Sequence, residues 1–286
     1  MTLWLTLAVN SIALGGLLFL LSSGFSLIFG LMRIPNLMHG SFFMLGAYLG
    51  VTLLAKGVNF WLAALASAAA MAVIGGLIER FLLRRLAGEQ LAQVLLTLGF
   101  AFIVGDVCLM LWTGDPWQPA TPDHLRGVVK MAGLHFPLYR LVIVIVAVLI
   151  AVGLWLLIDW TRVGAMIRAG VDDPAIARVV GIKVSRLFTL VFALGAALAA
   201  FGGVMGAPYL SVYPGLDFEI LPLALIVVIL GGTGSLLGAL VGSFLIGAVY
   251  NFGQAMLPDL AYVILFLPML LILVLRPQGL FGRVVS

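Results

Sequence analysis

The sequence predicts an all-α, polytopic helical membrane protein with about eight or nine transmembrane segments, some of them short or broken. Of its 286 residues, 64% are hydrophobic and only 9% are charged, whereas a soluble domain carries roughly 25% charged residues. The apolar residues form uninterrupted runs, several of which exceed the roughly 18 to 20 residues that a helix needs to cross a bilayer. We therefore expect one transmembrane domain over residues 1–286 and no separate soluble domain.

The apolar runs place the helices in order along the chain. The first run lacks preceding basic residues and exceeds the roughly 7 to 15 residues of a signal-peptide core, so we interpret it as a retained span. The breaks at Arg33–Asn36 and Gly231–Ser235 are short, and the second could join two half-helices. The predicted spans lie near residues 4–30, 39–56, 59–83, 91–113, 139–160, 187–207, 218–231, 234–254 and 259–276.

The distribution of Lys and Arg predicts the orientation of the chain. Eleven of the 15 basic residues fall on one side of the predicted spans and four on the other. The richer side is expected to be cytoplasmic, which places residues 161–186 and the C-terminus inside and residues 114–138 outside. This placement accounts for the net charge of +4 without any binding of nucleic acid.

Residues 161–186, the most polar stretch, are predicted to contain a short helix. Asp173 suits the N-cap, Pro174 the first helical position and Gly181 a left-handed stop. The segment Ala175–Val180 between them is too short to be stable alone, so it must pack on something. Its small residues favour a groove on a cytoplasmic protein, and the alternative is a helix resting on lipid head groups, which usually carries larger apolar residues.

Six segments, taken in order, carry a resemblance to a known family. They are Ile34–Gly40 with Leu45–Tyr48, Glu79-Arg80, Thr97–Gly99, Arg168–Gly181, Gly231–Ser235 and Arg276–Gly282. In these segments the chain resembles the permease subunits of branched-chain amino acid ABC importers, of the Liv type, over nearly its full length. The family usually has an aliphatic residue followed by Asn-Leu-Ala-His-Gly. This chain has Pro35 in place of the aliphatic residue and Met38 in place of the alanine. These two departures leave the identity of the solute open.

The resemblance implies a permease subunit that forms the translocation path of an importer in a bacterial inner membrane. Its implied partners are a second, related permease, two cytoplasmic ATPases that carry ATP and Mg, and a periplasmic solute-binding protein. No cofactor is expected on this chain, which lacks the phosphate loop Gly-x-x-x-x-Gly-Lys-[Ser/Thr]. In such importers a cytoplasmic loop helix sits in a groove on the ATPase. The residues expected to couple there are Arg162, Arg168, Asp172, Asp173, Pro174, Ala177, Arg178 and Gly181.

Polar residues within the apolar runs are the candidates for the translocation path. Asn36 and His39 flank a break at Pro35, where an interrupted helix can face a cavity; the alternative is a loop at the membrane interface. Asp106 is costly to bury in the fourth run, so it is either functional or a helix-end carboxylate. Thr97 could line the path or bond to its own helix backbone.

The glycine-rich break and the acidic residues define the remaining hypotheses. Gly231, Gly232 and Gly234 predict a tight helix crossing or a hinge. No Ser-His-Asp, Cys-His or His-Glu set is present in the sequence, so we expect neither a catalytic centre nor a metal site. The alternative function is an ion-coupled secondary transporter of a small polar solute, with Asp106 or Glu219 carrying protons.

Two further residues are interpreted structurally. Glu79, with Arg80, lies where the third span should meet the cytoplasm and is expected to be an orientation anchor; a second ATPase contact is the alternative. The single cysteine, Cys108, is expected to be a small core residue. Neither residue is therefore placed in a site.

Overall fold

The computed structural model describes residues 2–32, 36–131 and 134–282, which fold as a helical bundle with one small β-hairpin. The α-helices in this part of the chain are α1 Thr2–Met32, α2 His39–Ala55, α3 Phe60–Phe81, α4 Gln90–Trp112, α5 Leu138–Trp160, α6 Arg162–Asp172, α7 Pro174–Val179, α8 Val184–Leu210, α9 Leu216–Gly231, α10 Leu236–Met256 and α11 Ala261–Leu275. The short 3₁₀ turns are η1 Leu83–Leu86, η2 Asp123–Leu125 and η3 Pro258–Leu260. Strands β1 Val128–Met131 and β2 Leu134–Pro137 pair antiparallel inside the segment predicted as an outer loop.

The lengths of the helices confirm the class but not the predicted number of spans. Among the described residues, six helices are long and apolar enough to cross a membrane, namely α1, α3, α4, α5, α8 and α10. Helices α2, α9 and α11 contain 17, 16 and 15 residues, fewer than the roughly 20 that a full span requires. The chain is thus a polytopic helical membrane protein, and the count of eight or nine spans is not confirmed.

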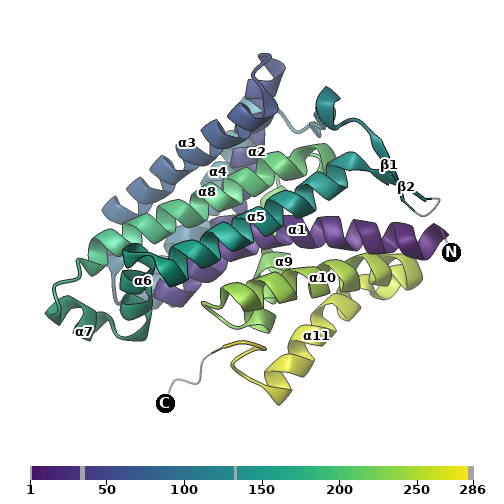
Figure 1. Ribbon diagram of the computed structural model, residues 1–286. Helices are drawn as coiled ribbons and strands as arrows, with labels where there is room; N and C mark the ends of the chain where they lie inside the picture. The colour runs from purple at the N-terminus through teal and green to yellow at the C-terminus, as the bar shows by residue number, and fades with distance from the viewer. Residues whose placement is uncertain (1, 33–35, 132–133, 283–286) are drawn as a thin grey trace.

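Helix α1 forms the centre of the bundle. Its most apolar stretch is 89% buried, compared with 17% for α4. It packs against α5, α8, α9 and α10, and Figure 1 shows it running between α5 and α10. A Cβ atom on Gly24 would lie 2.6 Å from the carbonyl oxygen of Gly195 on α8. The close approach of α1 and α8 therefore depends on glycine, as expected where lipid removes the hydrophobic drive for helix association.

Helices α2 and α9 begin inside the bundle rather than at one of its ends. His39, the first residue of α2, is hydrogen-bonded to the carbonyl oxygen of Leu21, in the middle of α1. Gly40 packs directly against the backbone of Asp217, in the first turn of α9. The N-termini of two short helices therefore meet in the apolar interior. The predicted break at Pro35 falls on residues 33–35, which lie outside the described residues.

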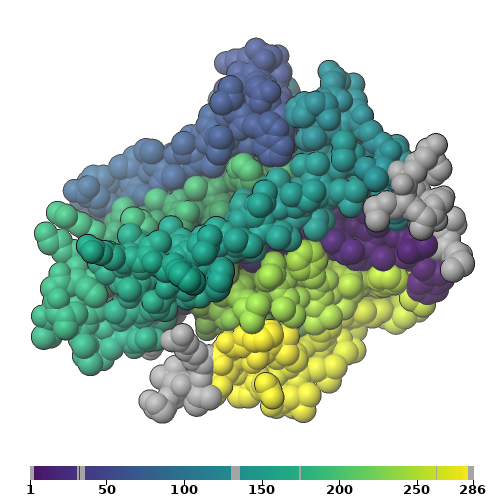
Figure 2. Space-filling model, in the orientation of Figure 1, coloured from purple at the N-terminus to yellow at the C-terminus, as the bar shows by residue number. Residues whose placement is uncertain are grey.

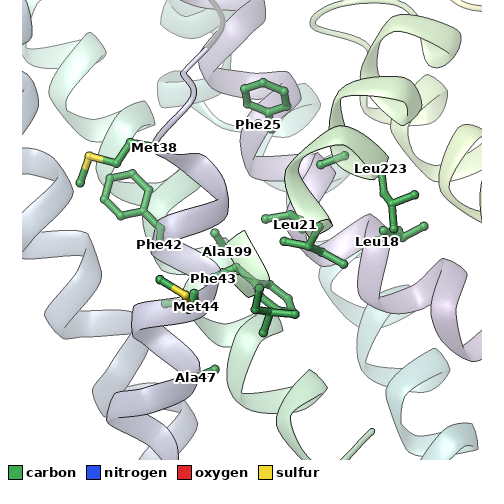
Figure 3. Packing of buried hydrophobic residues seen from close by; sticks show 14 of the residues in the cluster. Leu18, Leu21, Phe25, Met38, Phe42, Phe43, Met44, Ala47, Ala199 and Leu223 are labelled. Atoms are coloured by element: carbon green, nitrogen blue, oxygen red, sulfur yellow. The ribbon is translucent and has the colours of Figure 1, made fainter. Parts of the chain in front are cut away.

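Apolar side chains from α1, α2, α8 and α9 fill the space around this meeting point. Figure 3 shows them interleaved in a continuous core. Its labelled members are Leu18, Leu21, Phe25, Met38, Phe42, Phe43, Met44, Ala47, Ala199 and Leu223. The core fixes the start of α2 against both α1 and α9.

The connecting segments gather at two opposite ends of the bundle. At one end the start of α1 lies near the β-hairpin, and Trp4 stacks on Phe252 near the end of α10. At the other end lie α6, α7 and the tail after α11, which pairs with the last turn of α9 (Figure 1). The segments 114–138 and 161–186 thus lie at opposite ends, and which end faces the cytoplasm stays a prediction.

Candidate translocation and coupling sites

Asn36 and Thr97, both predicted for the path, meet at a small pocket before α2. Asn36 Oδ1 accepts a hydrogen bond from the Met38 N–H at 3.2 Å, and Thr97 Oγ1 accepts one from the Leu37 N–H at 3.3 Å. Gln93 also lines the pocket, which has only about 10 Å³ of space for a water-sized molecule. This is roughly the least volume that holds one water. In this conformation the pocket is therefore too small for a solute.

The hydroxyl of Thr97 also donates to the backbone of its own helix. Within the described residues, Asn36 Nδ2 and Gln93 Oε1 are buried without a hydrogen-bond partner. Unpartnered buried amide atoms are costly. The pocket therefore offers the NH₂ group of one amide as donor and the oxygen of another as acceptor to whatever enters it.

His39 is fully buried and is held from several sides. Its Nε2 lies 3.0 Å from the carbonyl oxygen of Leu21, and because a carbonyl only accepts, Nε2 carries the proton. The imidazole stacks on Phe25 with ring centroids 5.1 Å apart, and the Phe42 ring lies nearly perpendicular to it with a centroid separation of 6.2 Å. His39 thereby anchors the start of α2 to the middle of α1. The described residues hold no cluster of His, Cys, Asp and Glu that could bind a metal.

The two acidic residues that the sequence suggested as proton carriers lie on the surface, whereas a third acidic residue, next to one of them in the chain, is buried. Asp106 and Glu219 are exposed on α4 and α9. Asp217, two residues before Glu219, is only 2% exposed. The hydroxyl of Ser41 donates to Asp217 Oδ2 at 2.7 Å, while Oδ1 has no partner among the described residues. The sequence missed this residue, although a carboxylate in the first turn after a glycine is a helix-start signal.

A second buried carboxylate, Glu79, connects α3 to α8. Glu79 is 1% exposed and pairs with Arg84, whose Nη2 lies 3.0 Å from Oε2. The hydroxyl of Thr189 on α8 donates to the same oxygen at 2.5 Å, and Arg84 donates to the carbonyl oxygen of Ser185 at 2.7 Å. The carboxylate expected to be an orientation anchor is therefore a buried acceptor within a network whose other members are partly exposed. The network joins the end of α3 to the first turns of α8, which follow directly after the polar stretch.

The polar stretch 161–186 folds as two helices, α6 and α7, before α8 begins. Thr161 caps α6, a helix that the sequence did not predict. The Asp173 carboxylate caps α7 by accepting the N–H groups of Ala175 and Ile176 at 2.7 and 3.0 Å. Gly181 ends the turn with φ +87°. The predicted cap and stop of the short helix are thus present.

Helix α7 turns Ala177 inward and its branched residues outward. Ala177 is 2% exposed, so it packs within this chain and not on a partner, contrary to the expectation that it contacts the ATPase directly. Ile176 and Val179 remain 62% and 87% exposed, and Val180 is exposed beside them. Together with the exposed Arg178, these three aliphatic residues form what we term the α7 outer face.

The other predicted coupling residues lie on α6 and α7 or in the turns next to them. Arg168 donates to the carbonyl oxygen of Ile158 and lies 3.4 Å from Asp159 Oδ1, which attaches α6 to the end of α5. Pro174 begins α7, and its side chain lies outside the described part of the structure. The exposed members of the set are Arg162, Asp172 and Gly181.

The glycine-rich break is a junction where backbones are in close contact. A Cβ atom on Gly231 would lie 2.3 Å from the carbonyl of Gly238 on α10. Gly232, with φ +97°, lies against the C-terminal tail, and Gly234 touches Gly30 at the end of α1. The tail completes the junction by donating backbone hydrogen bonds to the last turn of α9. Of the two roles predicted for these glycines, this geometry corresponds to close packing.

A wider cavity lies at the opposite end of the bundle, between the α2–α3 turn and residues 117–126. Figure 2 shows these two segments projecting side by side. The cavity has a volume of about 520 Å³ and is lined by apolar and polar residues, among them Leu54, Phe60 and Trp117. At its rim Arg126 pairs with Asp123 at 2.7 Å. It is large enough to receive a small solute or a side chain of another protein.

Comparison with known proteins covers nearly the whole chain. A family profile described as branched-chain amino acid transport system / permease component matches residues 7–273. The high-affinity branched-chain amino acid transport system permease protein BraD of Pseudomonas aeruginosa is 30% identical, over 96% of this chain and 94% of its own. The corresponding LivH protein of Escherichia coli K12 is 28% identical over the same shares.

A relative with another named cargo matches over a shorter region. The autoinducer 2 import system permease protein LsrC of Klebsiella pneumoniae is 34% identical over 60% of this chain and 50% of its own. No solved structure matches. From the profile match and the full-length relatives, the chain belongs to the family of branched-chain amino acid transport system permease components.

Proposed function

We propose that this chain is the transmembrane permease subunit of an ATP-driven ABC importer for branched-chain or related amino acids. The observation that carries the proposal is the match to permease proteins of branched-chain amino acid systems over 96% of the chain. The subunit forms the translocation path and leaves ATP hydrolysis to separate subunits, in keeping with the absence of a phosphate loop from its sequence. The ion-coupled alternative is not favoured, because the full-length relatives belong to this permease family.

The α7 outer face is the proposed contact with a cytoplasmic ATP-binding subunit, one of two that carry ATP and Mg. Ile176, Val179 and Val180 are exposed although the inner side of the same short helix is already packed. Aliphatic side chains that remain exposed together mark interaction sites. The charged residues predicted to surround this contact are Arg162, Arg168, Asp172, Asp173 and Arg178.

The orientation follows from this contact. The end that carries α6, α7 and the C-terminal tail faces the cytoplasm of a bacterium, as the eleven basic residues on that side favour. The opposite end then faces the periplasm. Its cavity of about 520 Å³, next to the loop that contains Trp117, is where a periplasmic solute-binding protein would dock.

A second, related permease would pack on the outward face of α4. Asp106 is exposed on this helix together with Phe102 and Met110, and a carboxylate facing lipid at that depth is costly. A Cβ atom added to Gly99 or Gly105 would meet nothing within 4 Å, so another helix could approach this face closely. Packing of the second permease there would remove Asp106 from lipid and place it beside a shared path.

In the mechanism we propose, the ATPases move α7 when they close around ATP. Helix α7 packs on α6 and α8, and the network of Glu79, Arg84 and Thr189 joins α8 to α3. A displacement at the cytoplasmic end would thus reach the helices around the buried start of α2. There the proposed path residues Asn36, His39 and Thr97 would be uncovered.

Reconstitution tests this function. The permease, its ATPases and its binding protein in proteoliposomes are expected to take up leucine only with ATP. The permease alone should give no uptake when a pH gradient is applied. Uptake driven by that gradient in the absence of the ATPases would refute the proposal and favour the ion-coupled alternative.

A further inference from the structure

We propose that Asp217 and Ser41, where the starts of α9 and α2 meet, bind the ammonium group of the transported solute. The inference rests on the proposed function, since it assigns the site for one chemical group of an amino acid. The sequence analysis placed neither residue in a site. Both are brought together only by the contact between two short helices inside the bundle.

The charge of Asp217 is not balanced by a cation within the part of the bundle that the structure describes. Asp217 is 98% buried, yet the only side chain that hydrogen-bonds its carboxylate within the described residues is the neutral hydroxyl of Ser41, 2.7 Å from Oδ2; the other donors are the backbone N–H groups of Asp217 and Phe218. No ion pair found among the described residues includes Asp217. A buried carboxylate in a membrane is costly when no cation balances its charge. A solute ammonium would supply the missing cation, and Oδ1 is free to accept from it.

The start of α9 is also rich in hydrogen-bond acceptors. Pro222 has no N–H, so it cannot donate the helical hydrogen bond to the carbonyl of Phe218. That carbonyl belongs to the residue next to Asp217. An ammonium carries three donors and no acceptor. The carboxylate and the Ser41 hydroxyl oxygen, which lie within hydrogen-bond distance of each other, can both accept from an ammonium and would not suit an anion.

The arrangement of α2 and α9 also suits an amino acid. A short helix that begins within a membrane can direct its positive N-terminal end at an anionic group of a solute. Helix α2, of 17 residues, begins at His39, and its Gly40 touches the backbone of Asp217. An amino acid carries its carboxylate next to its ammonium. The start of α2 therefore offers a complementary environment beside the proposed ammonium site.

The site is closed in this conformation. Ser41 and Asp217 are both buried, and neither of them lines either of the two cavities described above. The segment 211–215 precedes α9, and its Val212 pairs with Trp117 through two backbone hydrogen bonds of 2.7 Å. A carrier that alternates between two accesses needs a state in which its central site is sealed. Binding of the solute at Asp217 would then belong to an opened state.

Uptake of leucine by the reconstituted importer provides the first test. Asp217→Asn is expected to lower uptake about tenfold or more, because a charge-assisted hydrogen bond is lost. Glu219→Gln, an exposed neighbour on the same helix, is the matched control and should stay within about twofold of the wild type, since it removes no buried contact. Lack of ATP-driven uptake by the wild type would refute the proposed function. Wild-type uptake together with more than half of that rate in Asp217→Asn would refute only the ammonium site.

Thermal stability of the purified permease–ATPase complex, without the binding protein, provides a readout that a purely structural role would not change. Millimolar leucine should raise the melting temperature of the wild type, whereas 4-methylpentanoate, which lacks only the amino group, should not. Asp217→Glu should keep part of this response, and Asp217→Asn should lose it. Equal stabilisation by both compounds, or none by leucine, would overturn the assignment even if Asp217→Asn fails to assemble.

Discussion

The contact between α7 and an ATPase can be tested by making its outer face polar. Fully burying a Val or Ile side chain contributes roughly 1.5–3 kcal/mol. Ile176 and Val179 still expose 62% and 87% of their surface, so docking would gain about 2–4 kcal/mol from the two together. Replacing both with Ser removes most of this gain. Because Ser and Val have similar helix propensities, α7 itself should persist.

The double variant Ile176→Ser, Val179→Ser is therefore expected to bind the ATPase at least about 30-fold more weakly, which corresponds to about 2 kcal/mol. The measurement is an affinity titration of the purified ATPase against permease in nanodiscs. Val128→Ser is the matched control, because this valine is 56% exposed at the opposite end of the bundle. If the double variant and the control both bind within about twofold of the wild type, well under 1 kcal/mol, the assignment of the α7 outer face is wrong.

Three further predictions concern buried positions. Gly24→Val should destabilise the permease by about 1–3 kcal/mol or more, because the added side chain overpacks against α8. The control Gly153→Ala, with open space around its Cβ, should leave the melting temperature nearly unchanged. Equal melting temperatures of the two variants would contradict the tight crossing of α1 and α8. Glu79→Gln should weaken the network with Arg84 by about 1.5 kcal/mol, which is the lower end for charged hydrogen bonds because Arg84 is partly exposed. The variant should also hydrolyse more ATP for each solute transported. An unchanged ratio of ATP to solute would show that the network only supports the fold. Ala177→Trp should disrupt the packing of α7 on its own chain and thereby reduce assembly with the ATPase, as measured by co-purification. Normal assembly together with coupled uptake would show that α7 does not need this packing.

Local signals in the sequence were sufficient to predict those features of the structure that depend only on residues close together in the chain. Asp173 and Gly181 predicted the ends of α7 correctly, because a cap is formed between residues two or three positions apart. The long apolar runs predicted the helical class for the same reason, since every backbone group in a lipid-embedded helix is satisfied within the helix. The family segments predicted membership in the permease family, which the full-length relatives confirm.

Burial of single residues along those helices depended on contacts between distant parts of the chain. Helix α9 is apolar on nearly all sides, so its sequence does not distinguish the buried Asp217 from the exposed Glu219. Ala177 likewise lies in a helix whose inner side is defined only by packing on α6 and α8.

The apolar runs and the family segments were enough to identify this chain as a helical membrane permease and to locate most of its helices. The tertiary structure decided at what depth α2 and α9 begin, and hence that Ser41 and Asp217 meet. An apolar run records that a segment avoids water, but it carries no information about depth, because a helix that starts at the surface and one that starts inside the bundle are equally apolar. Only the close packing of α1, α2, α8 and α9 fixes those starting points.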